Sequence, residues 1–75
     1  MPESANRIRK SSTAGTRHSG KRLDQAAAEL FPDYSRARLQ KWIRSGELTV
    51  DGRRLKPTYR VATGETLLLD AVVEA

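Results

Sequence analysis

The chain has 75 residues and a formal net charge of +5, with 14 Lys or Arg residues against 9 Asp or Glu. It contains no cysteine and one histidine, which excludes a disulfide framework, a thiolate metal site and most nucleophile–base pairs. No apolar run is long enough to span a bilayer and no apolar signal-peptide core is present, while the basic surplus favours a polyanionic partner such as nucleic acid.

Residues 1–20 are rich in Ser, Thr, Gly and Arg, and Ile8 is their only large apolar residue after Met1. Such a segment buries too little surface to offset the entropy lost on ordering. We therefore expect a flexible basic tail over residues 1–20, with His18 solvated, and one folded domain over residues 21–75. The cations of the tail could add general attraction to phosphates, or the tail could be only a solubilising leader.

The first helix is predicted from Lys21 to Phe31, where Pro32 disfavours its continuation. Asp24 falls in its first turn, where a negative charge suits the helix dipole. Its apolar residues recur at the spacing of one buried face: Leu23, Ala26, Ala27 and Leu30.

The second helix is predicted from Arg36 to Ser45. Ser35 is suited to cap its first turn, and Gly46 follows where a chain leaving a helix often needs positive φ. The helix buries one stripe, formed by Leu39, Trp42 and Ile43. Trp42 is therefore predicted to belong to the core rather than to an exposed stacking platform.

A hairpin is predicted directly after this helix. Leu48–Val50 alternates as a short strand, and Asp51-Gly52 is among the strongest two-residue turn signals. Residues 53–56 are expected to return as a second strand that Pro57 ends. Thr66–Leu69 forms a last strand whose unbroken apolar run suggests cover on both faces. The fold class is thus α+β, with two helices packed on a small, mostly antiparallel sheet of about three strands.

The charge of the second helix indicates what kind of partner it binds. Residues 36–45 carry four cations and no acid, and three more cations follow the hairpin turn within residues 53–56. A solvated helix face usually mixes signs, because Glu–Lys pairs one turn apart stabilise it. An external polyanion is the better explanation here.

The same stretch carries a family resemblance. The chain resembles the S4 RNA-binding domain in motifs that follow one another from about Lys21 to Leu69: Arg22-Leu23-Asp24, Ser35-Arg36, Trp42-Ile43, Gly46, Val50-Asp51-Gly52, Lys56-Pro57, Val61 and Gly64-Glu65. A narrower pattern is similar to the N-terminal S4 domain of the ribosomal large subunit pseudouridine synthase D family: Gly20 to Asp24 with Leu30 to Arg36. The chain departs from the S4 pattern in Asp51, where many S4 domains have Asn, and in Thr58, where Ser is usual.

The resemblance implies an S4-like (alpha-L) fold that recognises folded ribosomal RNA by shape and backbone. It further implies a cytoplasmic parent protein, an isomerase that acts on uridines of large-subunit ribosomal RNA during rRNA processing and ribosome biogenesis. We expect this chain to be a monomer that is not itself an enzyme, with no catalytic residue, cofactor, metal, membrane contact or small-molecule ligand. Asp24 stands in a motif like that of the synthases' catalytic aspartate, but it opens a helix in a domain too small for a uridine pocket, so we interpret it as structural.

Carried onto this sequence, the S4 pattern predicts the RNA-contacting side chains. The first group comes from the second helix and the far side of the hairpin: Ser35, Arg36, Arg38, Lys41, Arg44 and Lys56. The second group flanks them: Lys21, Arg22, Arg53 and Arg54.

Three other functions stay open at this stage. The abrupt end after the last strand indicates an excised domain, since the resembling synthases have a linker there. The chain could instead be a complete stand-alone S4 protein that binds ribosomal subunits. It could also be a basic protein-interaction module facing an acidic partner, or a DNA-binding domain.

Overall fold

The structure is a computed structural model and describes residues 5–74. Three strands and two helices follow one another as β1 (Ala5–Thr13), α1 (Leu23–Leu30), α2 (Arg36–Ser45), β2 (Leu48–Val50) and β3 (Thr66–Glu74), with a short 3-10 helix at Thr16–His18. The predicted α+β class, with two helices and a three-stranded antiparallel sheet, is confirmed.

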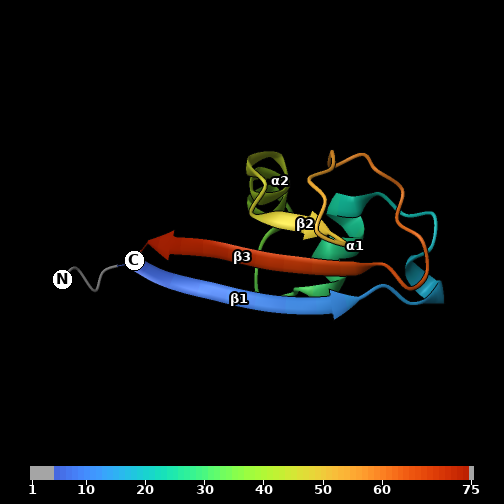
Figure 1. The fold of residues 1–75 in the computed structure, drawn as a ribbon, viewed down its shortest axis with the longest axis horizontal. Helices are drawn as coiled ribbons and strands as arrows, with labels where there is room; N and C mark the ends of the chain where they lie inside the picture. The colour runs from blue at the N-terminus through green and yellow to red at the C-terminus, as the bar shows by residue number, and fades with distance from the viewer. Residues whose placement is uncertain (1–4, 75) are drawn as a thin grey trace.

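The sheet has the strand order β1-β3-β2, and both pairings are antiparallel. β1 pairs with β3 along its whole length, from Ala5 opposite Glu74 to Thr13 opposite Thr66. β2 pairs only with residues 67–69 of β3. The strands β1 and β3 therefore continue past β2 and the helices as a two-stranded ribbon (Figure 1).

The expectation of a flexible tail over residues 1–20 is wrong for most of that segment; residues 1–4 lie outside the described part of the chain. Residues 5–13 form an edge strand of the sheet, because the backbone hydrogen bonds to β3 and the packing of Ile8 against the core offset the cost of ordering them. His18 is buried rather than solvated. Its Nδ1 accepts a hydrogen bond from the Gly15 N–H at 3.0 Å, and its Nε2 lies 3.6 Å from Glu29 Oε1.

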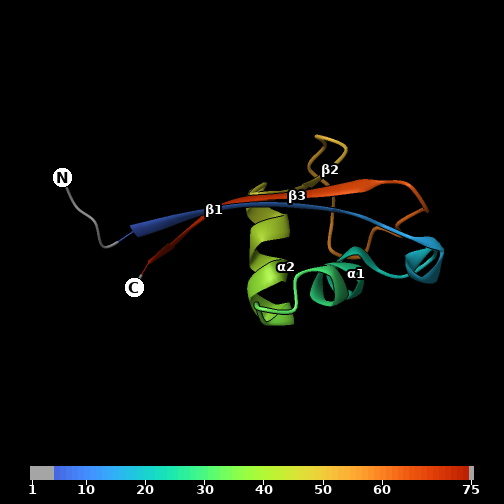
Figure 2. The same ribbon diagram turned by 90° about the horizontal axis from the view of Figure 1, so that it is seen from below.

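Both helices pack on the same face of the sheet, as the edge-on view in Figure 2 shows. Leu67 and Leu69 point from β3 into this layer and are buried, together with the predicted stripes of the two helices except Leu30, which is only partly buried. Leu68 points to the opposite face and keeps 37% of its surface exposed. The expectation that β3 is covered on both faces is thus wrong, because β3 alternates as a half-buried strand does.

The termini of α2 match the sequence prediction. Ser35 Oγ accepts a hydrogen bond from the Arg38 N–H at 3.1 Å, and Gly46 takes a left-handed conformation with φ of 89°. The predicted turn is present too, with positive φ at both Asp51 and Gly52. The second strand of the hairpin is not: one isolated bridge joins Val50 to Arg53, and the chain then leaves the sheet. The third strand is β1 instead.

Within residues 5–74, no helix has the length and apolar character needed to cross a membrane.

Candidate nucleic-acid interface

The burial of one face of α2 determines where its cationic side chains lie. Leu39, Trp42 and Ile43 are buried, so the side of the helix turned away from the core carries Arg38, Lys41 and Arg44, all exposed. The guanidinium carbon of Arg38 lies 5.8 Å from the centroid of the Trp42 ring, close enough for a cation–π contact. Trp42 itself packs edge-on against Tyr34, with 5.2 Å between the ring centroids. It is a core residue, as predicted.

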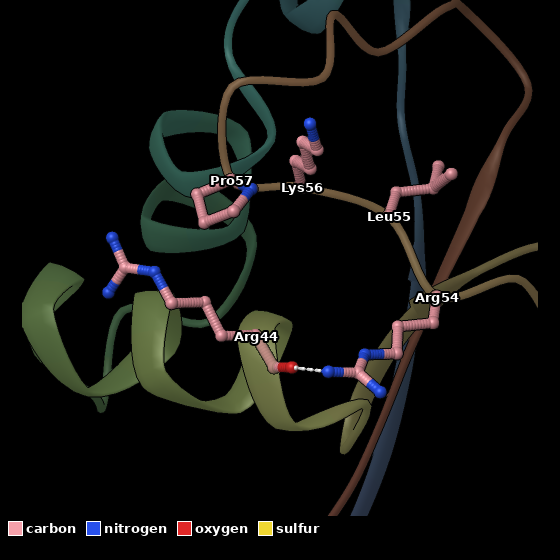
Figure 3. Close-up of a pocket in the computed structure, with 5 residues that line it drawn as sticks. All are labelled: Arg44, Arg54, Leu55, Lys56 and Pro57. Carbon is pink, nitrogen blue, oxygen red and sulfur yellow. Dashed lines mark hydrogen bonds between the residues drawn. The ribbon is translucent and has the colours of Figure 1, made fainter.

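A hollow of about 530 Å³ adjoins the end of α2. Figure 3 shows the residues that line it, which are Arg44 from the helix and Arg54 to Pro57 from the segment after β2. Pro57 is buried and Leu55 is half-buried, so the lining of the hollow combines these two apolar residues with cationic side chains. The role of Leu55 and Pro57 was missed from the sequence, because neither residue carries charge.

Arg54 also lines this hollow, but its guanidinium donates a hydrogen bond to the backbone carbonyl of Arg44 (Figure 3). This contact satisfies a carbonyl of the last helical turn and places a positive charge at the negative end of the helix dipole. A Cβ on Gly46 would lie 3.3 Å from Arg54 Cδ, so a larger residue there would displace the Arg54 side chain by a few tenths of an ångström. Arg54 thus has a structural role in addition to its predicted one.

The ten predicted site residues differ in the partners of their side chains. In the part of the chain that the structure describes, Arg38, Lys41, Arg44 and Lys56 have no carboxylate within 4.0 Å of their charged atoms. We call these four side chains the basic patch. Ser35 caps the N-terminus of α2, because its hydroxyl oxygen accepts a hydrogen bond from the Arg38 N–H.

Four of the other cations face carboxylates, whereas Arg54 donates to the carbonyl of Arg44. Lys21 Nζ lies 2.8 Å from Glu29 Oε2, and Arg53 Nη2 lies 3.9 Å from Glu65 Oε2. Helix α2 contains no acid of its own, but Arg36 has an acidic partner from α1: both Arg22 and Arg36 contact Asp24.

Asp24 is the centre of a network that joins the two helices. Its side chain is fully buried, and its oxygens accept hydrogen bonds from Arg22 Nε and Nη2 at 3.2 and 3.1 Å, from Arg36 Nη2 at 3.3 Å and from Gln40 Nε2 at 2.7 Å. Burial alone raises the pKa of Asp24, but the hydrogen bonds from Gln40, Arg36 and Arg22 outweigh it, so the pKa lies below the usual value. Gln40 was missed from the sequence.

This network predicts an acid-dependent loss of stability. The folded-state pKa of Asp24 is lowered, so its contribution is complete above the unfolded-state pKa of about 3.9 and is lost as the pH falls through the folded-state value. Carbon-13 NMR of the Asp24 carboxyl carbon measures that pKa directly, and we expect it below about 3.9. A titration at or above 3.9 contradicts the geometry of the network.

Within residues 5–74, no three His, Asp or Glu side chains come together as metal ligands would. What the surface does offer is a row of hydrogen-bond donors with positive charge.

The sequence has clear relatives. Residues 21–67, more than half of the chain, match the sequence model of the S4 domain. A protein of Yersinia pestis named ribosomal large subunit pseudouridine synthase D is 45% identical over 71 residues, which are 93% of this chain and 22% of that protein. The proteins of the same name from Pseudomonas aeruginosa and Escherichia coli K12 are 55% identical over 56 residues and 41% identical over 71 residues.

These matches confirm both resemblances drawn from the sequence motifs. They cover 75% of this chain for the Pseudomonas protein and 93% for the other two. The chain spans about a fifth of the length of these relatives, 18% in one case and 22% in the others.

Proposed function

Because the chain belongs to the S4 domain family, we propose that it binds structured RNA through the basic patch, and that this RNA is ribosomal RNA of the large subunit. The observation that carries the proposal is the row of exposed cations along α2 and at Lys56, none of which faces a carboxylate within the described residues. Such groups are available to phosphates, whose oxygens they can contact with charge-assisted hydrogen bonds.

The aromatic side chains support recognition of folded rather than single-stranded RNA. Phe31 and Trp42 are buried, while Tyr34 and Tyr59 are packed against the core and only partly exposed. Proteins that bind single strands rely on exposed aromatic rings on which bases stack. A basic surface without such rings is suited to the backbone and shape of folded RNA.

The relatives' name suggests the setting in which this domain works. We infer that it serves as the RNA-binding part of a ribosomal RNA pseudouridine synthase in the cytoplasm, acting as a monomer, and that the isomerisation of uridine takes place in another domain. The matched region covers about a fifth of each relative, which leaves most of their length for chemistry. In this role the domain raises the affinity for the RNA substrate and orients it.

A binding competition tests the proposal. The chain is titrated with a folded fragment of large-subunit ribosomal RNA, and duplex DNA of the same length or polyglutamate is added as competitor. We expect the RNA to be bound in preference to both, with an affinity that falls steeply with salt because bound counterions are released. Equal competition by DNA favours general nucleic-acid binding, and equal competition by polyglutamate favours a basic protein-interaction module.

A further inference from the structure

The network around Asp24 holds more positive charge than a buried carboxylate needs. One cation neutralises a carboxylate, yet Asp24 contacts two arginines and also accepts from Gln40. The three charged groups together keep one net positive charge. If the network served the core alone, Gln40 and one arginine would satisfy the carboxylate oxygens, so the second arginine requires another explanation.

Both arginines also face solvent. The side chain of Arg22 is 41% exposed and that of Arg36 is 47% exposed, while Asp24 between them is fully buried. A guanidinium has five N–H donors; Arg22 uses its Nε and Nη2 on Asp24, and Arg36 uses only its Nη2. The other N–H groups, including those on Nη1 of both residues, have no protein acceptor among the described residues and remain available.

Asp24 also brings the two groups together and limits their motion. Each guanidinium binds one or both oxygens of the same carboxylate, so the two cations lie side by side, although they would repel each other without it. Their side chains come from different segments, one directly before α1 and one at the start of α2. The entropy that long side chains lose on binding a ligand is therefore largely lost already in the free protein.

We propose that Asp24 is a positioning residue, which presents Arg22 and Arg36 as one preformed phosphate-binding site for RNA. This inference rests on the proposed RNA-binding function and adds a second contact to it. A phosphate oxygen can accept from the outward N–H groups of both arginines, in the planar fork geometry that guanidinium groups offer.

The site lies at the opposite end of α2 from the hollow beside Arg44. Arg36 and Arg44 are eight residues apart along the helix, which separates their Cα atoms by roughly 12 Å. An RNA backbone that follows α2 would thus be held at both ends. The added contact extends the surface available to the backbone from Arg44 to the first turn of α2.

Two substitutions distinguish positioning of the arginines by Asp24 from a simple effect of net charge on RNA binding. Asp24→Asn raises the net charge by one and removes the group that orients both arginines; Arg36→Lys keeps the charge and the ion pair but loses the planar fork. We expect each variant to bind the ribosomal RNA fragment roughly tenfold more weakly than the unchanged chain. Arg17→Lys, at an exposed site in the 3-10 helix, is the matched control and should bind as the unchanged chain does.

A second readout separates positioning from a purely structural role. The Nε–Hε NMR signals of Arg22 and Arg36 should shift when the RNA fragment is added, and those shifts should be reduced in Asp24→Asn. If Asp24→Asn does not fold, Arg36→Lys decides, because a lysine can still pair with Asp24 as a point charge.

The outcomes distinguish this inference from the function on which it rests. Tighter binding by Asp24→Asn, or unchanged binding by Arg36→Lys, overturns the inference. If Lys41→Ala with Arg44→Ala weakens binding in the same assay while Arg36→Lys does not, the proposed function stands and only the inference fails. If the unchanged chain does not bind the RNA, both fail.

Discussion

Replacing Lys41 and Arg44 together by alanine should weaken binding to large-subunit ribosomal RNA by roughly ten- to a hundredfold and leave the fold intact. Both side chains are exposed on α2, and within residues 5–74 neither faces a carboxylate, so their loss removes no packing and no ion pair. Each lost phosphate contact should also reduce the slope of log affinity against log salt by roughly 0.7–0.9. Titrations of the RNA fragment at several salt concentrations measure both quantities.

The matched control for this double variant is Arg9→Ala with Arg17→Ala. It removes the same charge from β1 and the 3-10 helix, where both arginines are exposed and lie outside α2. If binding depends on the position of the cations, the control should retain most of its affinity. Equal losses in the two double variants would mean that only the total charge matters, and that the basic patch is not the binding site.

Replacing Trp42 by alanine should unfold the domain, with a loss of about 3–5 kcal/mol in the free energy of unfolding. Trp42 is 5% exposed, it contacts the ring of Tyr34, and it packs within the core cluster that both helices share with the sheet. A domain of this size has only a few kcal/mol of total stability, so the loss is close to the whole. Thermal and urea unfolding followed by far-UV circular dichroism measure it.

Leu68→Ala serves as the control for that experiment. Leu68 is also a large apolar residue, but it lies on the uncovered face of the sheet, so its truncation should change stability far less. A Trp42→Ala variant that stays folded and loses only RNA binding would show that the indole is a binding group rather than a core group.

The parts of the fold that local residues determine were predictable from the sequence. Ser35 and Gly46 define the ends of α2, and Asp51 and Gly52 adopt the positive φ angles that their turn requires. The spacing of Leu39, Trp42 and Ile43 also places Lys41 and Arg44 on the outer face without any knowledge of the tertiary structure.

β1 could not be predicted in this way. Its strand structure depends on pairing with β3, which lies more than fifty residues further along the chain. Its inward positions include Lys10 and Ser12, which stand opposite Leu69 and Leu67, so it lacks the alternation of apolar residues that identifies a half-buried strand. By its composition alone, β1 therefore resembles a disordered segment.

The partners of the cations could not be predicted from local sequence either. Their exposure follows from helix geometry, but their partners come from other elements: Asp24 of α1 for Arg36, and the carbonyl of Arg44 for Arg54. One signal was present, since Asp24 adjoins the buried stripe that contains Leu23 and Ala27. A carboxylate at such a position needs a cation close to it, because an unpaired buried charge is strongly unfavourable.

Backbone NMR tests most directly whether α2 and the segment after β2 form the surface that contacts RNA. Amide shifts are recorded while a folded fragment of large-subunit ribosomal RNA is added to the chain. We predict the largest changes at Arg38, Lys41, Arg44 and Lys56, with little change at Thr49, Leu68 and Val72 on the opposite face of the sheet. Changes confined to that opposite face, or no changes at all, would contradict the claim.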